Sequence, residues 1–231
     1  MDITRVEVDG VDKDVLEYMI DVYINELFWL LTSIKSKCER LFEITKVPEK
    51  GSTIQIGLES NSLIKSIVDD SAEVANLIQP RKKGKHEPLE RYLFRKHRGE
   101  YLLNIFKNVT ISEILDHKLR DSLEHFDERL DHLTRDVSEK AVKKPQTLVY
   151  NMVISDMDIM QGTTHNHSFP LPIRIYVSSE RKIYNMSWQL DIGKIYMECT
   201  SMIEVLKGIE NLKKEKEPGG LLLPIPQMRD D

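Results

Sequence analysis

The sequence predicts an α+β protein in which a long helical region precedes a smaller mixed region. Apolar residues recur mostly at helical spacing from residue 11 to about residue 137, whereas after Pro145 they form short runs typical of strands. Helical spacing returns from about residue 201. The expected architecture is mainly α: an antiparallel four-helix bundle followed by a small β-meander and a C-terminal helix.

The four expected helices are bounded by prolines or a capping residue. They cover residues 11–44, 60–78, 88–107 and 112 to about 137. Pro48 and Pro80 follow the first two, Pro88 takes a favoured first-turn position in the third, and the Ser112 hydroxyl can cap the fourth. Short connections between long helices predict antiparallel neighbours.

The region after the bundle is expected to form strands first and a helix last. Strands are predicted over residues 147–154, 173–178, 182–190 and 192–197, and a helix over 201–216. The predicted domains are therefore a helical bundle at 1–144, a β-meander with its helix at 145–217, and an extended tail at 218–231.

The fourth helix has an apolar stripe with steps of three and four residues, which predicts one uninterrupted core-facing helix. The stripe consists of Leu115, Leu119, Leu123, Phe126, Leu130, Leu133 and Val137. Arg120 and His125 fall near the two edges of the opposite, polar face, about 140° apart at 100° per residue. One helix does not easily bring both side chains to one phosphate.

This helix resembles the signature helix of the HEPN superfamily. The resemblance rests on Arg120, the polar Asp121 directly after it, and His125 five residues after the Arg. Arg81 with His86, and Arg91 with His97, show similar spacing. Only the helix at Arg120 combines the polar residue, a long helical pattern and an acidic flank.

The resemblance implies a metal-independent endoribonuclease of a defence or toxin system. His125 would then act as general acid or base on the substrate 2'-hydroxyl or the leaving oxygen, Arg120 would stabilise charge on the phosphate, and Asp121 would orient His125. A homodimer would combine Arg120 of one copy with His125 of the other in a composite cleft. It implies no metal or other cofactor, and a possible antitoxin or other regulatory protein as partner.

A second interpretation is a non-catalytic HEPN-like module for dimerisation or RNA binding. Residues 111–139 hold nine acidic against four basic side chains, which would repel a substrate phosphate. Asp121 stands where Asn is commonest in the family, and Asp127 stands where one toxin subgroup has Tyr. Both interpretations stay open at this point.

A basic segment is the candidate RNA contact. Residues 80–98 hold eight basic and two acidic side chains, although the whole chain carries a formal charge of -5. Its first part is bracketed by prolines and interrupted by Gly84, which predicts a solvated loop. The predicted phosphate-binding residues are Arg81, Lys82, Lys83 and Lys85.

The remaining chemistry-bearing residues give weaker patterns. Cys38 and Cys199 lack disulfide or metal spacing and are expected to be buried, reduced thiols. His165 with His167, like Asp156 with Asp158, is too isolated to predict a metal site. No apolar run has membrane-spanning length and the N-terminus lacks a signal-peptide pattern, so a cytoplasmic protein without membrane partners is expected.

Overall fold

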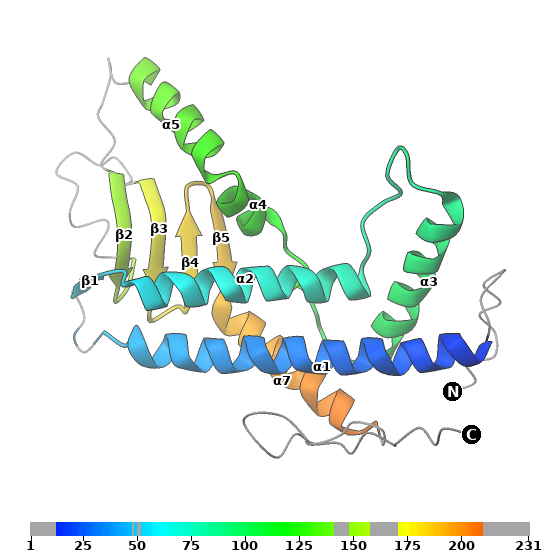
Figure 1. Cartoon of the computed structure of the whole chain (residues 1–231). Coiled ribbons are helices and arrows are strands. Elements are labelled where there is room, and N and C mark those ends of the chain that lie inside the picture. The colour runs from blue at the N-terminus through cyan, green and yellow to red at the C-terminus, as the bar shows by residue number, and fades with distance from the viewer. Residues whose placement is uncertain (1–12, 48, 50–51, 141–147, 158–170, 210–231) are drawn as a thin grey trace, which may run out of the picture.

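The computed structural model describes residues 13–47, 49, 52–140, 148–157 and 171–209. Within them the chain is a mixed α+β protein with six helices and one five-stranded sheet, which confirms the expected class (Figure 1). The helices are α1 Lys13–Ile44, α2 Leu58–Ile78, α3 Leu89–Ile105, α4 Lys118–Glu124, α5 Phe126–Lys140 and α7 Ile192–Lys207. The strands are β1 Thr53–Gln55, β2 Leu148–Ile154, β3 Leu171–Val177, β4 Lys182–Asn185 and β5 Trp188–Asp191.

Helices α1 and α2 pack side by side in opposite directions, and α7 crosses α1 (Figure 1). The buried face of α1 advances by alternating steps of four and three residues. It consists of Ile20, Ile24, Leu27, Leu31, Ile34, Cys38 and Leu41. This spacing keeps one apolar stripe against the neighbouring helix along the whole length of the pair. The sequence boundaries predicted for α1, α2 and α3 agree with the structure to within two residues.

The sheet has the strand order β1-β2-β3-β4-β5, and only β2 and β3 are parallel among its neighbouring pairs. Its inner face joins the helical core through Val153, Tyr176, Ile183 and Leu190. Strand β1 lies between α1 and α2 in the sequence, yet it pairs with β2 from Thr53 opposite Ile154. Segments on both sides of residue 145 therefore share one sheet and one core.

Two buried polar contacts fix the region between α3 and the sheet. The Glu198 carboxylate of α7 accepts hydrogen bonds from the backbone amides of Ser112, Glu113 and Ile114 at 2.8–3.0 Å, and from the Ser112 hydroxyl. The fully buried Asn185 amide donates to the Ser122 hydroxyl at 2.6 Å, which ties α4 to β4. Satisfied buried groups of this kind hold one relative placement of the elements.

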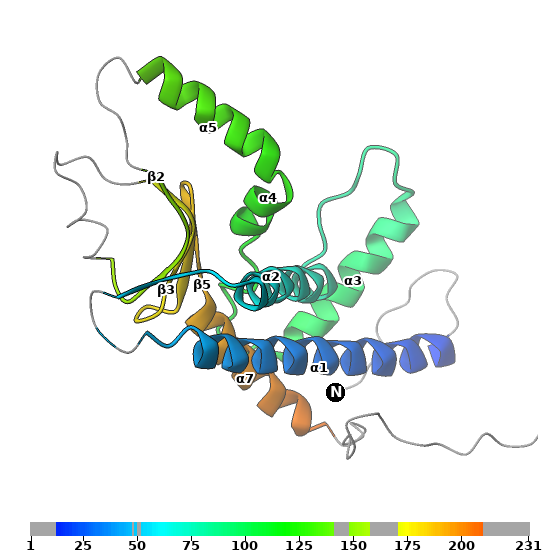
Figure 2. The same cartoon turned by 60° about the vertical axis from the view of Figure 1, so that its left-hand side comes forward.

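The single fourth helix predicted from residue 112 is wrong. Helical structure begins at Lys118 and breaks at His125, whose ψ of 38° interrupts the regular backbone between α4 and α5. Leu119 is fully buried, but Leu130 is 37% exposed, and Figures 1 and 2 show α5 leaving the body of the protein. The apolar stripe therefore packs in the core only in its first half.

The base of α5 rests on a kinked part of the sheet. Asn151 of β2 and Arg174 of β3 both have positive φ, 51° and 54°. The Arg174 guanidinium lies 4.2 Å from the Phe126 ring centre and 5.3 Å from that of Tyr150. These stacking contacts attach the first turn of α5 to the sheet.

Three details of the C-terminal region differ from the prediction. Residues 182–190 form a hairpin of two strands, and residues 192–197, expected as a strand, are the first turns of α7. The helix starts there because Asp191 accepts a hydrogen bond from the Lys194 amide at 2.8 Å, as an N-cap. Helix α7 ends at Lys207, and the predicted tail at 218–231 lies outside the described residues.

Candidate functional site

Arg120 lies on the side of α4 that faces α2. It lines a hollow of about 470 Å³ together with Lys65, Asp69 and Glu73 of α2. Its guanidinium bonds Glu124 at 2.6 Å, and its Nε atom is buried without a hydrogen-bond partner among the described residues. The Arg120 guanidinium therefore already has one carboxylate partner within the chain.

His125 occupies the break between α4 and α5 and does not line the Arg120 hollow. Its side chain is 57% exposed, and its Nδ1 atom lies 3.7 Å from the Glu128 carboxylate. Asp121 is exposed and was expected to orient the imidazole, but the carboxylate near His125 Nδ1 is that of Glu128. The break explains this, because residues four apart face each other only in a continuous helix. The structure does not bring Arg120 and His125 together within one chain.

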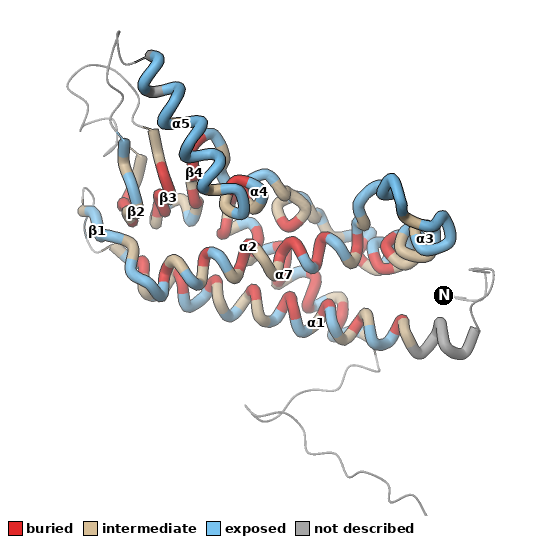
Figure 3. The backbone as a smooth tube through the Cα atoms, turned by 45° about the horizontal axis from the view of Figure 1, so that its top comes forward, coloured by how far each residue is buried: buried red, intermediate tan, exposed pale blue. Residues whose placement is uncertain are grey.

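The basic segment forms the wall of a pocket of about 570 Å³, at the end of α2 and along α3. Figure 3 shows the loop before α3 as mostly exposed. The basic side chains lining this basic pocket are Arg81, Lys82, His86, Arg91, Arg95 and Arg98. Glu87 is the single acidic residue among those lining it. The concentration of cations in a concave surface favours a polyanion.

An internal ion pair shapes the loop that carries these cations. Both Arg95 Nε and Nη2 donate to Glu87, at 2.9 and 2.8 Å, and the Gly84 amide donates to the same carboxylate at 3.1 Å. The hydrogen bond from Arg95 lowers the pKa of Glu87. Arg95 also donates to the Arg81 carbonyl at 3.3 Å, so its role is to hold the loop.

Arg98 also has a structural role in the wall of the basic pocket. Arg98 donates to the Asn76 carbonyl at 3.0 Å and lies 5.1 Å from the Tyr23 ring centre. Beside it, Gly99 packs directly on the Pro80 ring, where an added Cβ would overlap it. Arg81, Lys82 and Arg91 form no ion pair within 4 Å among the described residues, although Arg91 is near enough to Glu87 to help lower the pKa of that carboxyl.

Two of the four predicted RNA-contact residues line the basic pocket and two do not. Arg81 and Lys82 line the basic pocket, whereas Lys83 and Lys85 are exposed on the same loop but do not line it. Sequence reasoning missed Arg91 as a wall residue. The signal was present, since the cationic run continues into the helix, but which side chains share a concave surface depends on how α3 packs against α2.

The other chemistry-bearing residues give no site in the described part of the chain. Cys38 and Cys199 are buried free thiols, as expected, and desolvation raises the pKa of Cys38 to about 12. No group of three or more potential metal ligands occurs among the described residues, and His165, His167 and Asp158 lie outside them. None of the described helices is both long and apolar enough to cross a membrane.

No protein-family model, curated protein or solved structure matches this chain. The HEPN resemblance consequently rests on the residues of α4 and its flanks alone.

Proposed function

We propose that this protein is a non-catalytic RNA-binding module. The single observation that carries the proposal is the basic pocket, in which unpaired Arg81, Lys82 and Arg91 project from an ordered loop and the helix after it. Lys83 and Lys85, which are exposed on the same loop, extend the positive surface.

The ion pair within the loop supports this proposal. Arg95 pairs with Glu87, which fixes the loop, while Arg81 and Lys82 form no ion pair among the described residues. Keeping several like charges close together in one wall opposes folding unless a ligand supplies the counter-charge. RNA phosphates supply it, and each neutralised phosphate releases counterions.

Binding of a labelled single-stranded RNA, followed by fluorescence anisotropy over a range of salt concentrations, tests the proposal. Replacing Arg81, Lys82 and Arg91 by Gln should weaken binding by about tenfold or more and reduce the log–log salt slope by about 2. The matched control neutralises Lys107, Lys118 and Lys207, three exposed cations outside the pocket. A second variant, with Lys83 and Lys85 neutralised, should lose less than the pocket variant. No saturable binding at low salt, or equal losses in pocket and control variants, contradicts the proposal.

We further infer a homodimer, built on the exposed part of α5. Leu130 is 37% exposed there, and the helix stands away from the body (Figure 2). Two antiparallel copies of α5, paired about the point between Asp131 and His132, would place Leu130 opposite Leu133 of the partner subunit. At about 100° per residue, Glu128 and Arg135 lie on the opposite face of the helix and point away from this interface.

This arrangement differs from the composite cleft implied by the HEPN resemblance. It leaves the two His125 side chains about 20 Å apart along the helix axis. Analytical ultracentrifugation separates the two dimers. Leu130→Glu should give a monomer if α5 pairs through its apolar stripe, whereas Glu128→Arg, on the opposite face of the helix, should weaken only a dimer built on the polar face. A monomeric parent protein at micromolar concentration rejects both.

The second candidate function is an HEPN-like endoribonuclease, with α1–α4 as a divergent four-helix bundle. The observation that favours it is the position of His125, exposed at a helix break where a substrate can reach the imidazole. Arg120 would have to exchange Glu124 for a phosphate oxygen. A cytoplasmic location and an antitoxin partner belong to this proposal.

Cleavage of single-stranded RNA in the presence of EDTA tests the catalytic proposal. His125→Ala and Arg120→Ala should each lower the rate by about a hundredfold or more, and the products should end in a 2',3'-cyclic phosphate. His132→Ala is the matched control, because it removes an exposed imidazole of α5 that has no proposed role in cleavage. Absence of cleavage by the parent protein, or full activity of His125→Ala, leaves RNA binding as the function.

A further inference from the structure

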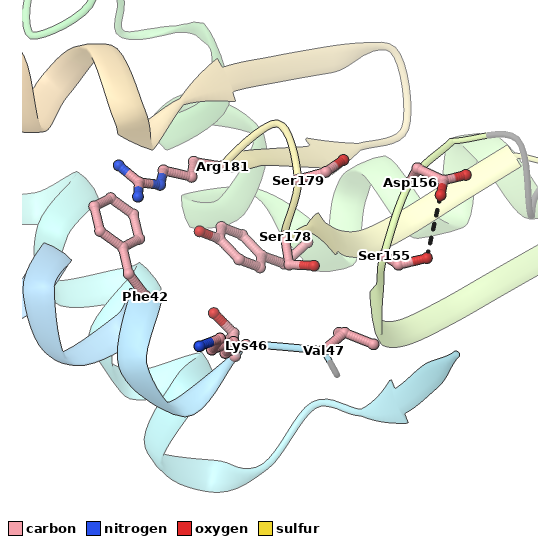
Figure 4. Close-up of a pocket in the computed structure, with 10 residues that line it drawn as sticks. Phe42, Lys46, Val47, Ser155, Asp156, Ser178, Ser179 and Arg181 are labelled. Atoms are coloured by element: carbon pink, nitrogen blue, oxygen red, sulfur yellow. Dashed lines mark hydrogen bonds between the residues drawn. The ribbon is translucent and has the colours of Figure 1, made fainter. Parts of the chain in front are cut away.

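A second pocket, of about 760 Å³, lies where the parallel strands β2 and β3 end (Figure 4). Ser155 and Asp156 follow β2, and Ser178 and Ser179 follow β3. The end of α1 closes the other side with Phe42, Thr45, Lys46 and Val47. The carboxyl ends of adjacent parallel strands are a common ligand position in sheets, and the volume suits a small molecule.

The charges of this strand-end pocket are separated. Figure 4 shows Arg181, Phe42 and Lys46 on one side and Asp156 on the opposite side. Lys46 follows α1 and Arg181 precedes β4. Neither cation forms an ion pair within the described part of the chain. Two unpaired cations at one end therefore favour an anionic group at that end.

Arg181 is held in place by its surroundings. Its φ is 54°, its guanidinium lies 4.3 Å from the Phe42 ring centre, and its carbonyl accepts a hydrogen bond from the Gly193 amide at 3.2 Å. A Cβ at Gly193 would lie only 3.3 Å from the Arg181 Cβ. A guanidinium fixed by stacking loses less freedom when it binds an anion.

The inner surface of the strand-end pocket contains a poorly satisfied donor. Tyr176 is 1% exposed, and its hydroxyl lies beside the Thr45 hydroxyl without a well-aligned hydrogen bond among the described residues. Burial raises the pKa of this phenol, so the group keeps its proton and acts as a donor. A buried hydroxyl with a poorly aligned hydrogen bond is costly, and a well-placed acceptor atom in the pocket would reduce that cost.

Other polar groups have local partners. The hydroxyls of Thr45 and Ser178 donate to the carbonyls of Leu41 and Ile154, so their oxygens are left to accept. Ser155 donates to Asp156 at 3.3 Å. The end away from the cations thus offers mainly acceptors, which suit the hydroxyl groups of a sugar or polyol.

We propose that the strand-end pocket binds a small phosphorylated sugar or nucleotide. Its phosphate lies between Lys46 and Arg181, within reach of the Tyr176 hydroxyl, and its ligand hydroxyls face Ser155 and Asp156. This site is separate from the basic pocket and does not depend on RNA binding.

Isothermal titration calorimetry of the full chain tests the site with ribose 5-phosphate and adenosine 5'-monophosphate as probes. Ribose, adenosine and inorganic phosphate are the comparison ligands. Saturable binding of a phosphorylated probe, about tenfold or more tighter than of the matching unphosphorylated compound, is expected. Saturation by neither phosphorylated probe at millimolar concentration overturns the proposal.

Variants assign the binding to the pocket. Lys46→Gln and Arg181→Gln should each weaken binding by about tenfold or more, and Tyr176→Phe, which keeps the ring, by a smaller factor. Lys107→Gln is the matched control and should bind like the parent. If Arg181→Gln fails to fold, exposed Lys46 still provides the test. Equal affinity of Lys46→Gln and Lys107→Gln contradicts the proposal. The Lys46 variant should also retain full RNA binding, which separates this site from the basic pocket.

Discussion

The segment at residues 112–114 and the basic pocket differ in whether the chain itself supplies partners for their polar and charged groups. Around Ser112, several backbone amides converge, and Glu198 of the same chain fills the space between them. In the basic pocket, Glu87 forms an ion pair with Arg95, but Arg81, Lys82 and Arg91 are exposed and form no close ion pair among the described residues. The amides of the first region all have an acceptor within the chain, which indicates a structural role. Several cations of the second region have no close ion pair, which indicates an anionic partner.

The largest loss of stability is expected from a substitution at Glu198, which serves the amides of residues 112–114. Glu198→Ala leaves the buried amides without an acceptor, and the free energy of unfolding should fall by about 3 kcal/mol or more. Urea denaturation measures this loss. Glu198→Gln, which keeps one acceptor oxygen, should lose less. A change within about 0.5 kcal/mol for Glu198→Ala would mean that water replaces the carboxylate without cost.

A smaller loss is expected where the basic pocket is joined to the helices. In Gly99→Ala the new Cβ meets the Pro80 ring, so α3 must shift, and stability should fall by about 1–3 kcal/mol. Gly57→Ala is the control, because nothing lies near that position and its backbone has negative φ. Thermal denaturation compares the two. Equal melting temperatures would show that α3 is free to move and that the wall of the basic pocket is not rigid.

A change in the open region should alter binding and not folding. Arg91→Gln should reduce RNA affinity by about fivefold and the salt slope by about 0.7, because one phosphate contact is lost. The melting temperature should stay within the range of ordinary surface substitutions. Anisotropy and thermal denaturation on the same samples give both quantities. A destabilised Arg91→Gln with unchanged RNA affinity would reverse the contrast drawn between the two regions.

The smallest effect concerns the ion pair that orders the loop. Arg95 lowers the pKa of Glu87, so the stabilisation from their pair is fully present above the ordinary Glu value of about 4.3 and is lost as the pH falls through the lowered value. The NMR shift of the Gly84 amide should report this titration with a midpoint below about 4.3. Glu87→Gln should abolish it. A midpoint at or above the ordinary value would show that the pair does not form in solution.

The sequence by itself determined the features that depend on local periodicity. The alternating steps of four and three from Ile20 to Leu41 predicted α1 and its buried face, and Pro80 and Pro88 bounded the exposed basic loop. Turn and helix signals depend on a few neighbouring residues, so they are visible in one chain. The start of α7 was also within reach, because Asp191 is a standard N-cap residue.

Tertiary structure decided which distant groups meet. The break at His125 occurs where the spacing predicts a continuous helix, and there α4 is tied to the sheet through Ser122 and Asn185 while α5 rests on Arg174. The parallel pairing of β2 with β3 created the strand-end pocket. The sequence indicated this parallel pairing only indirectly, because a long connection between two predicted strands permits a parallel pair but does not require one. Helical spacing fixes only which side chains share a face. Whether a partner covers that face is set by long-range packing, and this separated Arg120 from His125 and gathered Arg91 with Arg81 and Lys82.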